Sequence, residues 1–159
     1  EKWEIENYSK AYKKASSLTD IKVKTDLFLN FLSEFSKKKS KNIILTTGTL
    51  KTKNIENLKN ISKKINNNMY EINLNGAKGY LLLNQNFFAI SHIISKCSLF
   101  VSCHGAFTHI ASNYSVNILD IIEKNKYNHY KRITHHMIKH KFIYRDNFES
   151  LSETIINLP

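Results

Sequence analysis

The sequence predicts an α/β fold in which a parallel β-sheet carries helices on both faces. Apolar runs rich in β-branched residues alternate along the chain with segments whose apolar residues recur at helical spacing. Parallel neighbours in a sheet require crossover connections, and the helical segments between the runs can supply them. A length of 159 residues fits one domain that buries about two-thirds of its unfolded surface.

Four elements are predicted in the first half of the chain. Residues 26–35 form an amphipathic helix that ends in a run of lysines, which suit a helix C-terminus. Residues 42–48 are a short β-branched run that stops at a glycine, and residues 69–75 alternate between apolar and polar, so both are predicted strands. Between them a second helix is marked by apolar residues at helical spacing, namely Ile55, Leu58, Ile61 and Ile65.

The second half continues the alternation and completes the predicted domain, which we place at residues 16–159. Residues 1–15 lack a pattern and are predicted to be a tail or an interdomain hinge. The predicted elements are a helix at 87–97, a strand at 99–102, a helix at 106–113, a strand at 116–122, a basic loop, a strand at 141–146 and a helix at 148–158.

Composition excludes several classes of protein. The chain has 24 Lys and Arg against 13 Asp and Glu, a net charge of +11. That charge would suit a polyanion, but no aromatic-interleaved basic motif is present and Gly, Pro, Ala and Arg are scarce, so we interpret the lysines as compositional drift and expect no nucleic-acid partner. Two cysteines without zinc spacing predict neither redox chemistry nor a metal site. No apolar run approaches the length of a membrane span.

The most informative stretch is SLFVSCHGAFTHIASNYSVNILDII, residues 98–122. In an open parallel sheet, ligands bind at the carboxyl ends of the strands, where His104 and Gly105 are predicted to lie. Gly105 is predicted to take a positive φ and to let backbone approach a ligand, and the N–H groups from Ala106 to His109 would attract an anion. The imidazole of His109 would face the same anion, which suits a nucleotide diphosphate. A glycine and a histidine at such a turn can also be purely structural.

This stretch resembles the donor-binding half of GT-B glycosyltransferases, and is most similar to glycosyltransferase family 9, the ADP-heptose lipopolysaccharide heptosyltransferases and their relatives. The segment His109-Ile110-Ala111-Ser112 matches the family well. His104 stands where the family usually has aspartate, and Ala106 stands where one branch has a second glycine. The resemblance implies a Rossmann-like fold over roughly the last 140 residues.

The resemblance also implies a Ser/Thr-rich donor-phosphate segment followed by lysine, which Ser16, Ser17 and Lys22 fit. It implies a catalytic aspartate in an N-terminal acceptor domain, so we expect residues 1–159 alone to show no glycosyl transfer. It implies no cofactor and no metal, because helix dipoles and basic side chains offset the charge of the leaving diphosphate.

A second notable segment is residues 123–145, where seven Lys and Arg face one Glu, with His129, His135, His136 and His140 among them. His136 and His140 would share a face if the segment were helical, but no carboxylate or cysteine completes a zinc site. A basic loop near the ligand, a loop resting on anionic lipid and a merely solvated loop are all compatible with this pattern.

From these observations we expect the nucleotide-sugar donor-binding half of an inverting glycosyltransferase that builds bacterial surface polysaccharide or lipopolysaccharide. The expected partners are a nucleotide-diphosphate sugar, a glycan or lipid-linked acceptor, an N-terminal acceptor domain and an anionic membrane surface. The expected location is the cytoplasm, peripheral to the inner membrane. The alternative is a non-catalytic nucleotide- or polyanion-binding α/β module.

Overall fold

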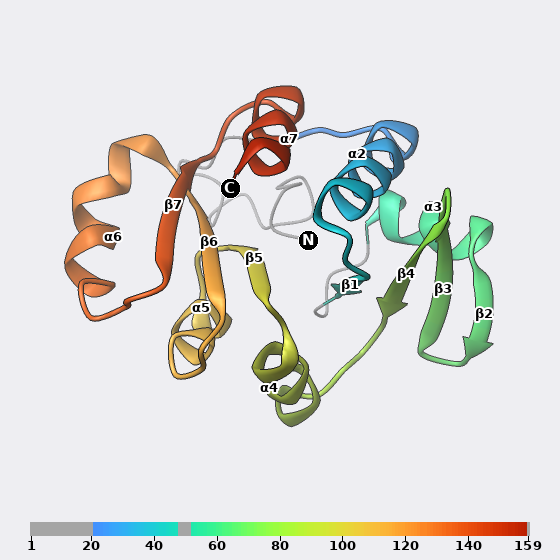
Figure 1. Cartoon of the computed structure of the whole chain (residues 1–159), viewed down its shortest axis with the longest axis horizontal. Coiled ribbons are helices and arrows are strands. Elements are labelled where there is room, and N and C mark those ends of the chain that lie inside the picture. The colour runs from blue at the N-terminus through green and yellow to red at the C-terminus, as the bar shows by residue number, and fades with distance from the viewer. Residues whose placement is uncertain (1–20, 48–51, 159) are drawn as a thin grey trace.

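A computed structural model describes residues 21–47 and 52–158, and it confirms the α/β class. The strands form a four-stranded sheet in the order β1-β4-β3-β2 and a three-stranded sheet in the order β5-β6-β7 (Figure 1). The elements are α2 (Thr25–Lys39), β1 (Ile43–Thr46), α3 (Lys53–Ile61), β2 (Lys63–Asn66), β3 (Met69–Leu74), β4 (Ala77–Leu82), α4 (Phe87–Lys96), β5 (Leu99–Cys103), α5 (Ala106–Ala111), β6 (Asn117–Ile122), the 3-10 turn η1 (Lys124–Lys126), α6 (Tyr127–Ile133), β7 (His140–Tyr144) and α7 (Phe148–Asn157).

The three-stranded sheet is parallel throughout, as the sequence predicts, and it carries helices on both faces. Side chains of successive residues in β6 point to opposite faces. On one face, Ile118 packs with α4 and α5 in a cluster that includes Ile94 and Ala111. On the other face, Leu119 and Ile121 pack with α7 and with aromatic side chains of α2. This sheet has the layered arrangement typical of Rossmann-like folds.

The four-stranded sheet is mixed, which differs from the parallel sheet that we expect from the sequence. Strand β1 runs parallel to β4, but β3 runs antiparallel to both of its neighbours. The reason is the two-residue connection Asn75-Gly76, because so short a turn can join only antiparallel strands. Both residues have positive φ, 52° and 104°, as such hairpin turns require.

The second helix is shorter than predicted, and the assignment of Ile65 to it is wrong. Helix α3 begins after Thr52, whose hydroxyl caps it by accepting a hydrogen bond from the N–H of Ile55, and it ends at Ile61. Ile65 lies in β2, which pairs with β3. Ile61 and Ile65 are both exposed, so burial does not favour a fourth helical turn.

The segment after β6 is also more ordered than the predicted basic loop. It contains η1 and the two-turn helix α6 before the chain enters β7. His136 lies beyond the end of α6 and His140 begins β7, so the two histidines do not share a helical face.

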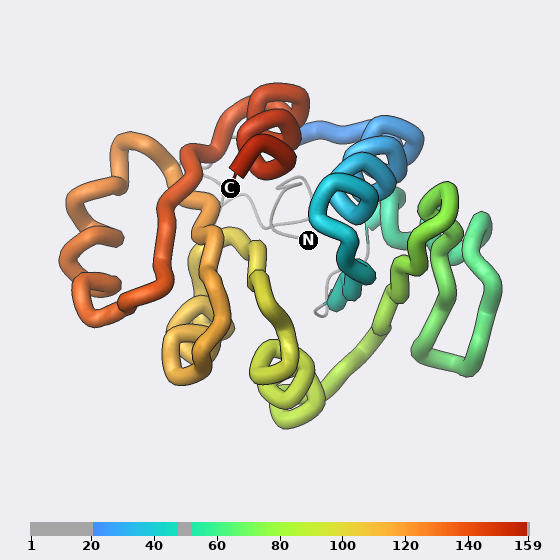
Figure 2. Tube along the Cα trace, in the orientation of Figure 1, coloured from blue at the N-terminus to red at the C-terminus, as the bar shows by residue number. Residues whose placement is uncertain are grey.

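Helices α2 and α7 lie side by side along one border of the molecule, which brings the two ends of the described chain together (Figure 2). Phe31 of α2 meets Phe148 of α7 edge to face at 5.7 Å between ring centroids. The Lys38 ammonium donates to Asn157 Oδ1 at 2.7 Å. Within the described residues, no helix combines the length and the apolar character that crossing a bilayer would take.

Candidate functional site

The histidine loop, residues 104–109, lies at the carboxyl end of β5, as predicted. His104 donates its backbone N–H to the Ile121 carbonyl at 3.3 Å, which ties the loop to β6. Thr108 is fully buried, and its hydroxyl accepts the N–H of Gly105 at 3.3 Å and lies 3.3 Å from the hydroxyl of Ser102. The turn from β5 into α5 is therefore fixed by Thr108.

The predicted positive φ of Gly105 is wrong. Gly105 has φ −180° and ψ −171°, an extended conformation. The turn needs no left-handed residue because His104 continues the line of β5 and α5 starts directly after Gly105. The N–H of Thr108 donates to the carbonyl of Gly105 at 3.0 Å, and α5 has only six residues. An anion at this loop would therefore be recognised by the side chains more than by the backbone N–H groups.

A buried carboxylate, Asp120, holds the first histidine of the loop. Asp120 lies in the middle of β6 with 0% of its surface exposed. Its Oδ2 accepts hydrogen bonds from His104 Nδ1 at 2.6 Å and from His140 Nε2 at 3.0 Å. The two histidines come from the end of β5 and the start of β7, the strands on either side of β6. One buried acid therefore orients one imidazole from each neighbouring strand.

The electrostatics of Asp120 depend on these two histidines. Burial by itself would raise the pKa of the Asp120 carboxyl, but the hydrogen bonds and positive charge of His104 and His140 outweigh burial and hold the pKa below its usual value. The other carboxylate oxygen, Oδ1, is buried and has no hydrogen-bond partner within the described part of the chain. Asp120 is thus a buried anion compensated on one oxygen only.

Two further rings lie against His104, and a third lies against His109. The imidazole of His104 lies 5.2 Å from that of His109 and 4.4 Å from the phenol ring of Tyr130 on α6, measured between centroids. His109 in turn stacks on His136 at 6.3 Å. Burial lowers the pKa of His109, and the neighbouring His104 and His136 lower it further. Together with His140 on Asp120, these contacts join four histidines in one cluster.

The sequence prediction located His104, Gly105, Ala106 and His109 in one loop, and the structure keeps them together. Lys22 is exposed, and its neighbour Ile21 packs with Leu119 and Ile121, on the face of β6 opposite to Asp120. No described contact joins Lys22 to the histidine loop. Ser16 and Ser17 lie outside the described residues. Asp120, Tyr130 and His140 belong to the cluster and were not predicted as site residues.

A second polar group lies on the other face of the same sheet edge. Arg145 follows β7 and Glu123 follows β6, and Arg145 Nε lies 3.5 Å from Glu123 Oε1 in a buried ion pair. Arg145 Nη1 also donates to Cys103 Sγ at 3.1 Å. All three residues follow or end parallel strands, so both faces of this carboxyl edge carry polar side chains.

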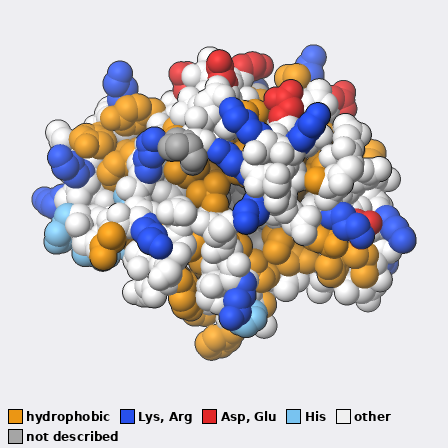
Figure 3. All heavy atoms as spheres, in the orientation of Figure 1, with side chains coloured by type: hydrophobic (Ala, Val, Ile, Leu, Met, Phe, Trp, Pro, Cys, Tyr) orange, Lys and Arg blue, Asp and Glu red, His pale blue; other side chains and the backbone are white. Residues whose placement is uncertain are grey.

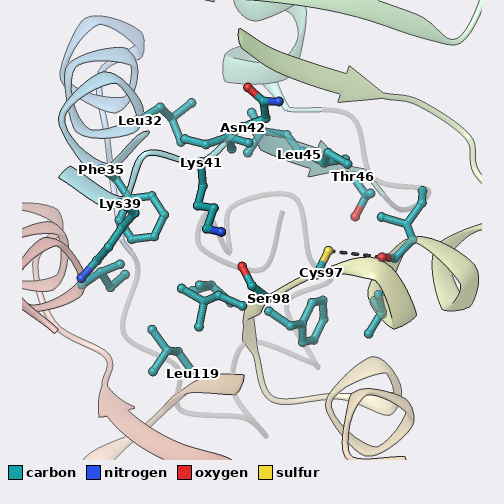
Figure 4. Close-up of a pocket in the computed structure, with 18 of the residues that line it drawn as sticks. Leu32, Phe35, Lys39, Lys41, Asn42, Leu45, Thr46, Cys97, Ser98 and Leu119 are labelled. Carbon is teal, nitrogen blue, oxygen red and sulfur yellow. Dashed lines mark hydrogen bonds between the residues drawn. The ribbon is translucent and has the colours of Figure 1, made fainter. Parts of the chain in front are cut away.

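A cleft of about 1030 Å³ lies between the two sheets, lined by β1 and β5, the terminal strands of their sheets, with α2 and α4 (Figure 4). Lys41 and Ser98 point into it from opposite walls, and Cys97 Sγ donates to the Ile93 carbonyl at 3.2 Å. Its described lining holds five lysines and neither Asp nor Glu. His140 lines the cleft, but the histidine loop does not. Asp120 connects the cleft to the loop, because it is hydrogen-bonded both to His140 and to His104.

The described part of the chain offers no ready-made set of metal ligands. Among residues 21–47 and 52–158, no three His, Cys, Asp or Glu side chains are grouped so that they could hold an ion. His104 and His140 both use a ring nitrogen on Asp120.

No protein-family model matches this chain, and no curated protein or solved structure matches it either.

Proposed function

We propose that this chain binds a nucleotide-diphosphate sugar at the histidine loop and acts as the donor-binding half of an inverting glycosyltransferase. The observation that carries the proposal is the support of His104 by the buried Asp120, next to His109, at the carboxyl end of a parallel strand. In open α/β sheets this end is where ligands bind.

The charge distribution around the loop supports an anionic ligand. Asp120 Oδ2 accepts hydrogen bonds from His104 and His140, so the two imidazoles cover the carboxylate. His104 has 11% of its side chain exposed and Asp120 has none. The imidazole rings therefore stand between an approaching ligand and the carboxylate.

The chemistry of inverting transfer gives these histidines a role. When the bond between the sugar and the diphosphate breaks, negative charge grows on the departing diphosphate, and donors held in place stabilise that charge without reorganisation. His104 and His109 supply such donors from two directions, since their rings meet at 83°. The acceptor hydroxyl must lose a proton to a base, which we assign to a separate acceptor domain.

The wider role follows from the donor class. A transferase of this kind would act in bacterial surface polysaccharide or lipopolysaccharide synthesis, in the cytoplasm at the inner membrane, on a glycan or a lipid-linked acceptor. The alternative, a nucleotide- or polyanion-binding module without transfer, is favoured by the exposed lysines and arginine of the segment 124–141. The two are separated by whether the chain, joined to an acceptor domain, transfers the sugar.

Calorimetric titration with ADP-, GDP- and UDP-linked sugars tests the binding step, with a CMP-linked sugar as the monophosphate comparison. His109→Ala is expected to weaken diphosphate binding by about 1–3 kcal/mol, the range for removing a hydrogen-bond partner of a charged group. His92→Ala, which removes an exposed histidine of α4, is the matched control and is expected to bind as the wild type does. If His109→Ala and His92→Ala bound the diphosphate sugar with equal affinity, the histidine loop would not be part of the donor site.

A further inference from the structure

The end of the molecule formed by α6 and β7 has an unusual surface, which we call the basic end. Residues 124–141 contain no Asp or Glu. The exposed side chains that define the basic end are Lys124, Lys131, Arg132 and Ile138; Lys139 and Lys141 are exposed too but line the cleft between the sheets. In Figure 3 this end, at the left, shows Lys, Arg, His and hydrophobic side chains and no acidic one.

The nearest acids along the chain hardly weaken this positive charge. Asp120 is fully buried and hydrogen-bonded to His104 and His140. Glu123 is buried beside Arg145. Only Asp146, just beyond β7, is exposed to solvent. The surface of the basic end therefore attracts anions over a distance of about a Debye length.

Ile138 gives this surface a second character. Its exposed fraction is 97%, the highest among the large apolar side chains that are described as exposed. The preceding residue, Met137, is buried, and its N–H donates to the Thr134 carbonyl at 2.9 Å, so the turn that presents Ile138 is anchored to the protein. Tyr144, under the ammonium of Lys124, adds an aromatic ring that is 44% exposed.

A fully exposed aliphatic side chain next to cations distinguishes between two anionic partners. Nucleic acid would satisfy the lysines but would leave Ile138 against phosphate and water. An anionic lipid surface satisfies both, because its headgroups attract cations while its acyl boundary accepts an apolar side chain. Tyrosine is also enriched at that boundary.

We propose that the basic end docks on an anionic membrane surface, with Ile138 inserted below the headgroups and Lys131 and Arg132 on the lipid phosphates. Docking does not depend on donor binding, because none of these residues belongs to the histidine loop. If the chain failed to bind a nucleotide sugar, the membrane-docking proposal would still stand. If it failed to bind vesicles, the proposed donor site would still stand.

Vesicle co-sedimentation tests the proposal directly. The full chain is expected to bind phosphatidylcholine vesicles that contain phosphatidylglycerol, to bind pure phosphatidylcholine far less, and to dissociate as salt is raised. A Lys131→Gln/Arg132→Gln variant is expected to bind roughly 25-fold more weakly, since each of the two cations near an anionic surface contributes about fivefold. Ile138→Ser is expected to lose about tenfold, from the loss of one inserted side chain.

The matched control is Lys63→Gln/Lys64→Gln, which removes two exposed lysines from β2 at the opposite end of the molecule (Figure 1). It carries the same net charge as the α6 variant and is expected to bind nearly as the wild type does. Circular dichroism melting of each variant confirms that it is folded. Equal losses in the two double variants would show a non-specific effect of net charge and would overturn the proposal. So would an unchanged Ile138→Ser, or tight binding to RNA without binding to vesicles.

Discussion

Replacing Asp120 by asparagine tests the organisation of the site most severely. The carboxylate is fully buried and accepts two hydrogen bonds, from His104 at 2.6 Å and from His140 at 3.0 Å. A hydrogen bond to a charged group contributes about 1.5–3 kcal/mol. Both bonds end on Oδ2, so the carbonyl oxygen of asparagine can keep them, but the charge is lost and a buried N–H₂ donor takes the place of Oδ1, which has no partner among the described residues.

The expected loss in the free energy of unfolding is therefore about 2–4 kcal/mol at neutral pH. For a chain of this length that corresponds to a fall in Tm of about 5–15 °C. Urea unfolding followed by circular dichroism measures the loss. Asp146→Asn, an exposed position, is the control and should stay within about 0.5 kcal/mol of the wild type.

The pH dependence gives an independent check with a definite sign. The pKa of Asp120 is held below its ordinary 3.8 in the folded protein, so the unfolded chain binds the proton first. The stabilisation is therefore complete above the ordinary pKa and is lost as pH falls below it. The difference between wild type and Asp120→Asn should shrink in that acid range. An Asp120→Asn protein as stable as the wild type at neutral pH would refute the assigned role of the carboxylate.

Two further predictions concern His109 and Gly76. Because burial and the neighbouring histidines lower the pKa of His109, diphosphate binding must restore its proton, and affinity should be higher at about pH 6 than at about pH 8. Calorimetry should show a smaller pH dependence of diphosphate affinity in His109→Ala. If the variant kept the full pH dependence, another titrating group would be responsible for it. Gly76 has a φ of 104° with nothing near its missing Cβ, so Gly76→Ala should cost about 1 kcal/mol in urea unfolding, from backbone strain alone. A stabilised variant would contradict the assigned turn.

Local sequence patterns predicted most of the parallel sheet and its helices. The runs at 99–102 and 116–122 became β5 and β6, and the periodic segments at 26–35 and 148–158 became α2 and α7, each within a few residues of the predicted bounds. These segments bury a continuous apolar face, and burial is what such patterns report.

The mixed sheet was missed although part of its signal is in the sequence. Asn75-Gly76 is a strong two-residue hairpin signal, and residues 77–82 on its far side form β4. Ile65 extended the helical spacing of α3 by chance, and pairing with β3 decided its structure instead. Helical periodicity over a short and largely exposed segment does not distinguish a fourth turn from an edge strand.

The candidate site was predicted in part. The position of the loop followed from its place after a strand, whereas the φ of Gly105 could not be read from the residue type. Asp120 is an acid inside an apolar strand, but its two histidine partners lie 16 and 20 residues away in sequence. Only the register of three parallel strands brings them together, and the sequence does not determine that register.

A crystal structure of the chain with a bound nucleotide-diphosphate sugar would test the proposed function most directly. The proposal predicts that diphosphate oxygens lie within hydrogen-bond distance of the His109 ring, with His104 still held on Asp120 beside them. A diphosphate bound among the lysines of the cleft between β1 and β5, with no contact to His104 or His109, would contradict it.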